Sequence, residues 1–252
     1  MNNKASLFHQ KAKIYEEYRP DYPLNTVKLL EEKAYLKKGS VIAEIGCGTG
    51  KFTDLLLDEG YQVAAVEPDH SMSAILESKH LQSDLRIYNC FAEQTPFEDH
   101  QFNAIISAQS FHFFHTESVR NEFFRILKKD GDIVVLWYLF DTNLDISNHI
   151  QNLFIKYGDL QNQPRRHDTK AETVYKCFSG CQISNDDSYK YRIQYSKDKF
   201  LKNMLSSSYA PNKTSVLYSH FLEDFTNLYT AYSDNGIISC EYKLDVYHIR
   251  NQ

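Results

Sequence analysis

Two acidic residues and a run of glycines form the part of this sequence with the clearest chemical potential. The apolar stretch 41–45 includes Glu44, glycines follow at positions 46, 48 and 50, and residues 51–57 have the pattern of a helix start. Glycine allows a tight turn and a close approach of the backbone to a ligand. The N–H groups of the loop and of the helix start can then donate hydrogen bonds. The order strand, glycine-rich loop, helix predicts a nucleotide-type site at the end of a parallel strand.

The spacing of the glycines helps to decide which nucleotide would bind. The dinucleotide fingerprint is G-x-G-x-x-G, which places a pyrophosphate at a helix N-terminus. Here the spacing is G-x-G-x-G, and Glu44 precedes it. A carboxylate has no use beside a pyrophosphate but suits a ligand with an amino group. A second acid, Glu67, ends the next apolar run about 20 residues later, the distance expected for hydrogen bonds to ribose hydroxyls. NAD or FAD binding, or a turn that binds nothing, are the alternatives.

Four stretches together resemble one enzyme family. The segment 44–50 resembles the first motif, E/D-x-G-x-G-x-G, of class I S-adenosylmethionine (SAM) dependent methyltransferases. Residues 92–97 resemble A-E-x-L-P-F, with Thr95 in place of leucine, and residues 108–114 resemble A-x-x-x-H-W-F, with Phe113 in place of tryptophan. Residues 15–23 resemble the Y-x-x-x-R-P-x-Y-P entry of small-molecule methyltransferases related to trans-aconitate methyltransferase. Asn103 stands where the family usually has aspartate, and it keeps a hydrogen-bonding side chain but loses the charge.

The resemblance implies SAM as cofactor, with S-adenosylhomocysteine as its product. It also implies a role for single residues. Arg19 would pair with the cofactor carboxylate, Glu67 would accept from the ribose and Glu93 from the exocyclic amine. The residues that it places at the cofactor are Arg19, Glu44, Gly46, Cys47, Gly48, Gly50, Glu67, Pro68, Met72, Ala92, Glu93 and Gln109.

The resemblance also suggests where the methyl acceptor binds. His112 is the candidate catalytic residue, as a base or as a group that only aligns the acceptor, because the imidazole pKa lies near neutrality. The candidate acceptor wall consists of Tyr15, Tyr22, Phe111, Phe113 and Tyr209. An apolar wall with few polar groups is typical of a small-molecule pocket. We expect a small-molecule acceptor and favour oxygen over nitrogen methylation. No metal is expected, since the five cysteines form no C-x-x-C pair.

The elements that must position these residues fit one α/β domain. The resemblance implies a Rossmann-like seven-stranded sheet with an antiparallel last strand, helices on both faces and a small helical cap. We expect an N-terminal lid at 1–23, a cofactor-binding core at 24–140, and cap insertions with terminal antiparallel strands at 141–252. Apolar runs and alternation predict strands at 41–45, 61–67, 85–90, 102–107, 133–140, 189–195 and 237–249. Helical patterns are found at 8–19, 24–36, 51–59, 73–79, 119–129, 144–158, 173–178, 198–205 and 217–232, and a polar loop is expected at 161–170.

Composition limits the partners. The 252 residues carry a formal net charge of −5 and no long basic run, which disfavours wrapping of nucleic acid. There is no apolar stretch of about 18 residues and no apolar signal core, so we expect a cytoplasmic protein without membrane contact, as a monomer or homodimer. Two other functions stay open. The protein could methylate a protein or RNA, or it could bind SAM without catalysis.

Overall fold

One mixed sheet organises the chain. The computed structural model describes residues 12–81, 85–157, 168–207 and 209–250. Along the sheet the strands follow the order β3-β2-β1-β4-β5-β8-β6, and β7 also pairs with β8. Their bounds are β1 Val41–Ile45, β2 Gln62–Val66, β3 Arg86–Tyr88, β4 Phe102–Ala108, β5 Leu127–Phe140, β6 Gln182–Asp186, β7 Lys190–Tyr195 and β8 Ile238–Arg250.

The pairing agrees with the expected topology. Strands β3, β2, β1, β4 and β5 run parallel, and β8 lies antiparallel beside β5 over residues 133–140. The two shorter strands β6 and β7 pair with successive parts of β8, at residues 246–250 and 238–243. The sheet is therefore seven positions wide, and its last position is shared by two strands. Strand β6 was not predicted from the sequence.

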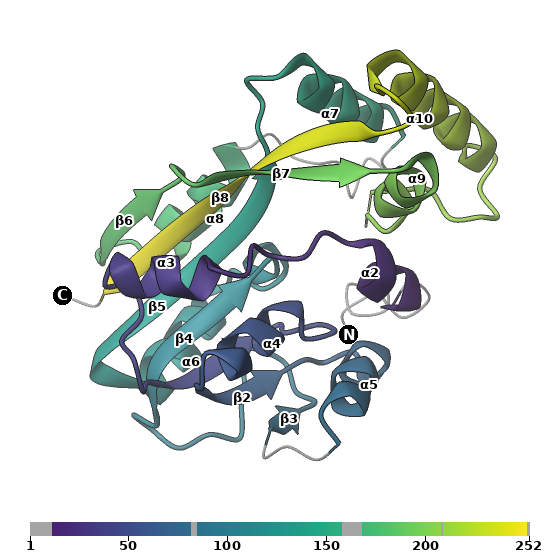
Figure 1. Cartoon of the computed structure of the whole chain (residues 1–252). Coiled ribbons are helices and arrows are strands. Elements are labelled where there is room, and N and C mark those ends of the chain that lie inside the picture. Colours follow the sequence, from purple (N-terminus) through teal and green to yellow (C-terminus); the bar gives the residue numbers. More distant parts are fainter. Residues whose placement is uncertain (1–11, 82–84, 158–167, 208, 251–252) are drawn as a thin grey trace.

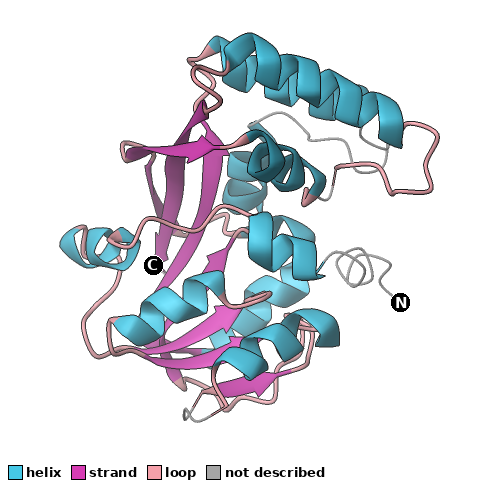
Figure 2. Cartoon of the chain, turned by 45° about the vertical axis from the view of Figure 1, so that its right-hand side comes forward, coloured by secondary structure: helices cyan, strands magenta, loops and turns pink. Residues whose placement is uncertain are grey.

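Helices cover both faces of the sheet (Figures 1 and 2). Their bounds are α2 Ala12–Tyr18, α3 Thr26–Glu32, α4 Lys51–Asp58, α5 His70–Lys79, the short 3-10 helix η1 Phe111–Phe113, α6 Glu117–Ile126, α7 Asp145–Tyr157, α8 Asp168–Cys177, α9 Lys197–Leu205 and α10 Tyr218–Tyr232.

Alternating strand residues divide the core in two. On β5, Val134 and Leu136 belong to the core shared with α3, α4 and the helices α7, α9 and α10. Their neighbours Ile133, Val135 and Trp137 belong to the core shared with α6 and α8. Successive side chains of a strand point to opposite faces, so a central strand that is apolar at every position serves both cores.

Helix α10 packs on both α7 and α9, and the three helices form a cap at one end of the sheet (Figures 1 and 2). Helix α2 lies between this cap and the core, because it packs against both α9 and α5. Lys202 of α9 donates to the Tyr18 hydroxyl at 2.9 Å, and Lys79 of α5 lies 3.2 Å from Glu16. Helix α2 therefore makes one polar side-chain contact to each side. The expected lid residues 1–11 lie outside the described residues.

Three expectations about local structure were wrong. Helix α6 ends at Ile126, and residues 127–131 are extended as the start of β5, where Leu127 pairs with Phe102 before an irregularity in the register. Helix α3 ends at Glu32, four residues early. Helix α8 begins at Asp168, so the end of the expected polar loop is helical; the rest of that loop lies outside the described residues. In each case tertiary packing or strand pairing overrides a weak local preference.

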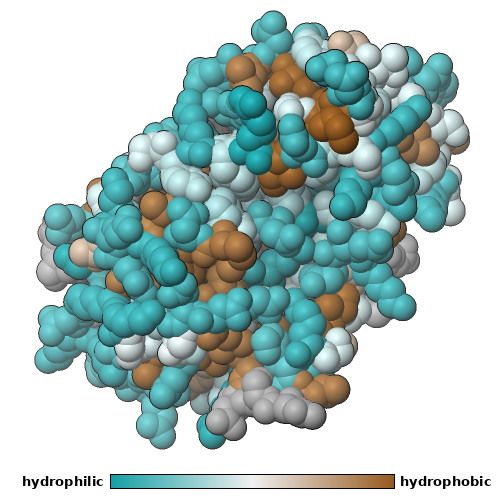
Figure 3. Space-filling view, viewed as in Figure 1, coloured by the Kyte–Doolittle hydropathy of each residue, from teal (hydrophilic) through white to brown (hydrophobic). Residues whose placement is uncertain are grey.

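The surface is mostly polar. In the view of Figure 3, hydrophilic side chains cover most of the face and hydrophobic ones gather in small separate areas. Scattered exposed apolar residues of this kind are normal. Within the described part of the chain, none of the helices has the length and apolar character needed to cross a membrane.

Candidate active site

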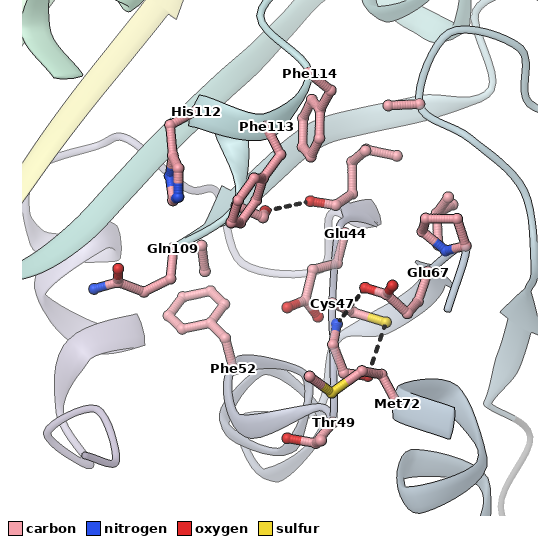
Figure 4. A pocket seen from close by; sticks show the side chains of 18 of the residues that line it. Glu44, Cys47, Thr49, Phe52, Glu67, Met72, Gln109, His112, Phe113 and Phe114 are labelled. Atoms are coloured by element: carbon pink, nitrogen blue, oxygen red, sulfur yellow. Dashed lines mark hydrogen bonds between the residues drawn. The ribbon is translucent and has the colours of Figure 1, made fainter. Parts of the chain in front are cut away.

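The loop between β1 and α4 forms the floor of a cavity at the carboxyl ends of the parallel strands (Figure 4). Glu67, just after β2, braces this loop. One of its carboxylate oxygens accepts from the Gly48 N–H and the other from the Asp69 N–H, each at 2.9 Å. Burial raises the pKa of Glu67 to about 7, against the effect of these two hydrogen bonds. The contact of Glu67 with a ribose stays a prediction, and the structure adds that this acid also holds the glycine loop.

Glu44 is the second carboxylate of the floor. It is 1% exposed, and its Oε2 accepts from the Thr53 hydroxyl of α4 at 2.6 Å. Burial raises the pKa of Glu44 to about 8. An ionised carboxylate is costly in such a place unless a cation or further donors compensate it. A positively charged ligand above the loop would provide that compensation.

Two of the three glycines are needed for packing. A Cβ on Gly46 would lie 2.6 Å from both Cβ and Oγ of Ser110, and one on Gly50 would lie 2.3 Å from Leu76. Gly48 differs, because a Cβ there would meet no protein atom within 4 Å. Gly50 was expected at the cofactor but does not line the cavity. As the left-handed N-cap of α4 it fixes the direction of that helix against α5.

The opposite wall comes from the segment after β4. Gln109 has a positive φ of 58°, unusual for a residue other than glycine, and its side-chain amide donates to the Tyr138 carbonyl at 2.8 Å. Such strained residues often lie at functional sites. The chain then enters η1, from which His112, Phe113 and Phe114 face the cavity (Figure 4).

The hydrogen bond of His112 limits its chemistry. Trp137 Nε1 lies 3.2 Å from His112 Nδ1. An indole nitrogen can only donate, so Nδ1 is the acceptor, and the proton of the neutral imidazole is then on Nε2. In this arrangement His112 is a hydrogen-bond donor, and it has no nitrogen lone pair left to act as a base. The sequence had left both roles open.

Phe111 was wrongly placed in the acceptor wall. It is fully buried, and its ring stacks on Phe178 of the segment after α8, with 5.4 Å between centroids. Successive residues of a 3-10 turn point in different directions, so only its neighbours reach the cavity.

All other residues expected at the site line the cavity; they are Tyr15, Arg19, Tyr22, Glu44, Gly46, Cys47, Gly48, Glu67, Pro68, Met72, Ala92, Glu93, Gln109, His112, Phe113 and Tyr209. Sequence reasoning missed Phe52 of α4, Phe114 and Lys170 of α8. Phe52 follows directly after the glycine loop, and the sequence placed it in the helix without a site role. Nothing in the local pattern around Lys170 marks it as a site residue, since it reads as part of a polar loop.

A second cavity adjoins the first beneath the cap. The two share four lining residues, Arg19, Gln109, Lys170 and Tyr209. The second cavity is lined by the end of β5 and by α7 and α9, with Phe140, Phe154 and Met204 among its apolar side chains. Several buried polar atoms at the two cavities have no hydrogen-bond partner among the described residues; they are Arg19 Nε, Thr49 Oγ1, Tyr138 OH and Ser147 Oγ. Buried polar atoms without a hydrogen-bond partner are rare in native proteins, so these four atoms are candidates for hydrogen bonds to a bound ligand.

The comparisons with known proteins agree with this geometry. The methyltransferase domain family matches residues 43–135. An uncharacterized methyltransferase of Staphylococcus carnosus is 35% identical over 150 residues, which cover 58% of this chain and 67% of that protein. The chain belongs to the class I SAM-dependent methyltransferases. A Saccharomyces cerevisiae protein named a probable SAM-dependent methyltransferase is 28% identical over 151 residues, 57% of this chain and 50% of that protein.

The fold extends further than the sequence similarity. A solved structure of a presumed type II methyltransferase from Anaeromyxobacter dehalogenans has a TM-score of 0.67 and 16% identity, with 92% of this methyltransferase and 98% of that chain covered. At this identity the likeness concerns the fold alone. The methyltransferase spans little more than half the length of the curated relatives that it matches first. The trans-aconitate relationship suggested by residues 15–23 stays a prediction.

The residues present fit the SAM that the family implies. The buried Glu44 and the partly buried Glu67 face a cavity that also contains Arg19 Nε, which has no hydrogen-bond partner among the described residues. SAM carries a sulfonium and an ammonium group together with a carboxylate. The acidic floor and the guanidinium at its rim therefore complement the two kinds of charge.

Proposed function

We propose that this protein transfers the methyl group of SAM to an oxygen of a small molecule. The observation that carries the proposal is the pair of joined cavities. One lies over the glycine loop, and the other lies under the cap with an apolar lining. The cofactor would fill the first cavity and the acceptor the second, so that the two reactants meet at the four shared residues.

The bound SAM supplies a methyl group already activated by the sulfonium charge. The protein's task is then mainly to align the acceptor oxygen, and positioning of this kind can supply much of a rate enhancement. In this proposal Arg19 holds the cofactor carboxylate, while Glu44 and Glu67 hold the positive and hydroxyl-bearing parts. His112 donates from Nε2 to the acceptor, which fixes its orientation.

The lid completes the site. Tyr22 packs edge-on against Phe52 and Tyr138, with ring centroids 5.0 and 5.3 Å apart, so the segment after α2 lies against the cavity wall. The polar contacts of α2 to α5 and α9 are the partly exposed side-chain bonds Lys79–Glu16 and Lys202–Tyr18, and such bonds are individually weak. We expect hydrogen exchange over residues 12–22 to slow when SAM is added. Full protection of this segment in the empty protein would contradict a role as a lid.

Activity with extracted metabolites tests the proposal. The purified protein is incubated with SAM carrying a labelled methyl group and with a small-molecule extract, and the labelled product is identified by mass spectrometry. Label in a small molecule, bonded to oxygen, supports the proposal. Label only in a protein or RNA fraction would overturn the acceptor class, and SAM binding without any transfer would indicate a binding protein.

The role of His112 is tested separately. His112→Ala should lower kcat much more than the affinity for SAM, because we assign the Nε2–H of this imidazole, which lines the first cavity, to an acceptor that reaches the junction of the two cavities. Trp137→Phe removes the donor that fixes the imidazole and should lower kcat as well, by a smaller factor. An unchanged kcat in both variants would show that this pair only packs.

A further inference from the structure

Lys170 lines the site but has no role in the reaction proposed above. It lies on α8 and lines both cavities at their junction. Its Nζ sits 5.4 Å from the centre of the Trp137 ring, and Trp137 in turn holds His112. The side chain therefore ends beside the ring of the residue that binds His112.

Among the described residues, Lys170 has no ion-pair partner. Arg19 faces it across the junction and repels it. Asp245 of β8 attracts it from beyond ion-pair distance, and the oxygens of this carboxylate already accept from Asn185 and from the Tyr247 hydroxyl. In the described part of the chain, no carboxylate lies within ion-pair distance of Lys170 or Arg19.

Two cations at one junction favour an anion between or beside them. Burial, and to a lesser degree the charge of Arg19, lowers the pKa of Lys170 to about 7. The amine therefore loses its proton at a lower pH than an exposed lysine does. A negative charge beside it would favour the ammonium form again, since an opposite charge nearby stabilises the charged state.

We propose that Lys170 holds the methyl acceptor through an ionised oxygen, which is the nucleophile of the reaction. This inference rests on the proposed function and narrows its acceptor to an acidic small molecule with an apolar body. The apolar body would occupy the second cavity among Phe140, Phe154 and Met204. Arg19 remains assigned to the cofactor carboxylate, so each cation has its own anion.

The transfer step then needs no separate base. The electron pair of the acceptor oxygen forms the new bond to the methyl carbon, the carbon–sulfur bond breaks, and its pair stays on sulfur. The oxygen becomes neutral, as an ester or an ether, and loses its attraction to the ammonium of Lys170. Lys170 would therefore bind the acceptor more tightly than the product, which favours product release.

Two kinds of acid would supply the same ionised oxygen. A carboxylic acid arrives already ionised, and Lys170 must then take a proton from the solvent. A hydroxyl such as a phenol arrives neutral and gives its proton to the amine, so that no proton is exchanged with the solvent. The number of protons taken up on binding therefore distinguishes the two sources.

The test measures the binding of three probes of similar size, benzoate, phenol and benzamide, to the protein saturated with S-adenosylhomocysteine. Calorimetry at pH 8 in two buffers with different ionisation heats gives the affinities and the proton count. We expect benzoate or phenol to bind at least tenfold more tightly than benzamide. Proton uptake with benzoate identifies the carboxylate source, and tighter phenol binding without uptake identifies the hydroxyl source.

Variants on the same helix make the test specific to this side chain. Lys170→Met should abolish the preference over benzamide. Lys170→Arg should keep the preference for benzoate without proton uptake, because arginine stays charged, whereas a phenol that ionises beside arginine must release its proton to the solvent. Lys176→Met, at an exposed lysine near the end of α8, is the matched control and should change neither the preference nor the proton uptake. The affinity of each variant for S-adenosylhomocysteine checks that it is folded and that the cofactor cavity is intact.

Failure of this inference can be told from failure of the proposed function. If S-adenosylhomocysteine binds but the native protein shows no preference for the acidic probes, or binds none of the three at millimolar concentration, Lys170 is not the acceptor's anchor. A preference that survives in Lys170→Met leads to the same conclusion. If S-adenosylhomocysteine itself does not bind, the cofactor assignment fails first.

Discussion

Gly48 offers the sharpest test of the cofactor site, because the structure separates its role from those of its neighbours. Its φ is +60°, and a Cβ there would meet no protein atom within 4 Å. The residue nevertheless lines the cavity. A methyl group at this position would therefore enter space that we propose the cofactor takes, with little effect on the packing of the protein.

The expected magnitudes follow from the backbone and from the contacts. Holding alanine in a left-handed conformation costs about 1–2 kcal/mol. The less flexible unfolded chain returns about 0.4–1 kcal/mol of this cost. We expect Gly48→Ala to lower the free energy of unfolding by about 1 kcal/mol and the affinity for SAM at least tenfold, which is about 1.4 kcal/mol of binding free energy.

Two further glycines serve as comparisons. Gly60→Ala is the control for backbone strain, because φ there is +81°, the Cβ also meets open space, and the residue does not line the cavity. It should cost similar stability and leave SAM binding unchanged. Gly46→Ala should cost about 1–3 kcal/mol more than either, as expected for overpacking. Its Cβ would meet Ser110, whose hydroxyl is fixed by the Ile45 carbonyl at 2.9 Å.

Thermal unfolding and calorimetric titration with SAM measure both quantities on each variant. Unchanged SAM affinity in a folded Gly48→Ala protein would refute the close approach of the cofactor to this loop. An equal loss of affinity in Gly60→Ala would show that strain, transmitted through the fold, is the cause.

The remaining predictions concern stability. Burial raises the pKa values of Glu44 to about 8 and of Glu67 to about 7, so these two acids keep protons in the folded protein that they lose in the unfolded chain between about pH 4.5 and 7, below the range where the lowered pKa of Lys170 acts in the opposite direction. The melting temperature of the empty protein should fall as pH rises through that window, and Glu67→Gln should flatten the fall; a rise would contradict the burial of both acids. Asn103→Ala removes the acceptor of the Val41 N–H, 3.1 Å away, and should lower the free energy of unfolding by about 1 kcal/mol without changing SAM affinity. Asp132→Ala removes the buried carboxylate that two β8 side chains contact at 2.7 and 2.8 Å, and should cost about 2 kcal/mol in chemical denaturation. Those hydrogen bonds lower the pKa of Asp132, so the stability that they provide should be lost as pH falls through the pKa of Asp132 in the folded protein. If the native protein and Asp132→Ala lose the same stability on acidification, this reasoning is wrong.

Most of the cavity that we assign to the cofactor could be predicted from local sequence patterns. The order of strand, loop and helix is local, and the glycines with Glu44 and Glu67 have fixed spacings that only a parallel strand arrangement explains. Asn103 was expected to keep a hydrogen-bonding role without the charge. Its side chain accepts from the Val41 N–H of β1 and from Lys128, which is that role.

The part of the protein around the proposed acceptor site is formed by tertiary contacts, which no local sequence pattern predicts. Phe111 was placed in the cavity wall and lies in the core, because the turn of η1 directs its ring towards Phe178. Strand β6 exists through its pairing with the end of β8, and most of its residues are exposed or only partly buried, which gives no clear alternation to detect.

Lys170 shows most clearly why a site residue of this kind could not be predicted from the sequence. In the sequence it is one lysine in a polar stretch, whose ordinary interpretation is a solvated loop. The tertiary structure makes the residue helical and brings it to Trp137 and Arg19, which come from distant parts of the chain. Burial beside another cation is a property of that assembled environment and not of any segment. The packing of α8 and of the N-terminal segment around the end of β5 therefore decided the charge at the proposed acceptor site.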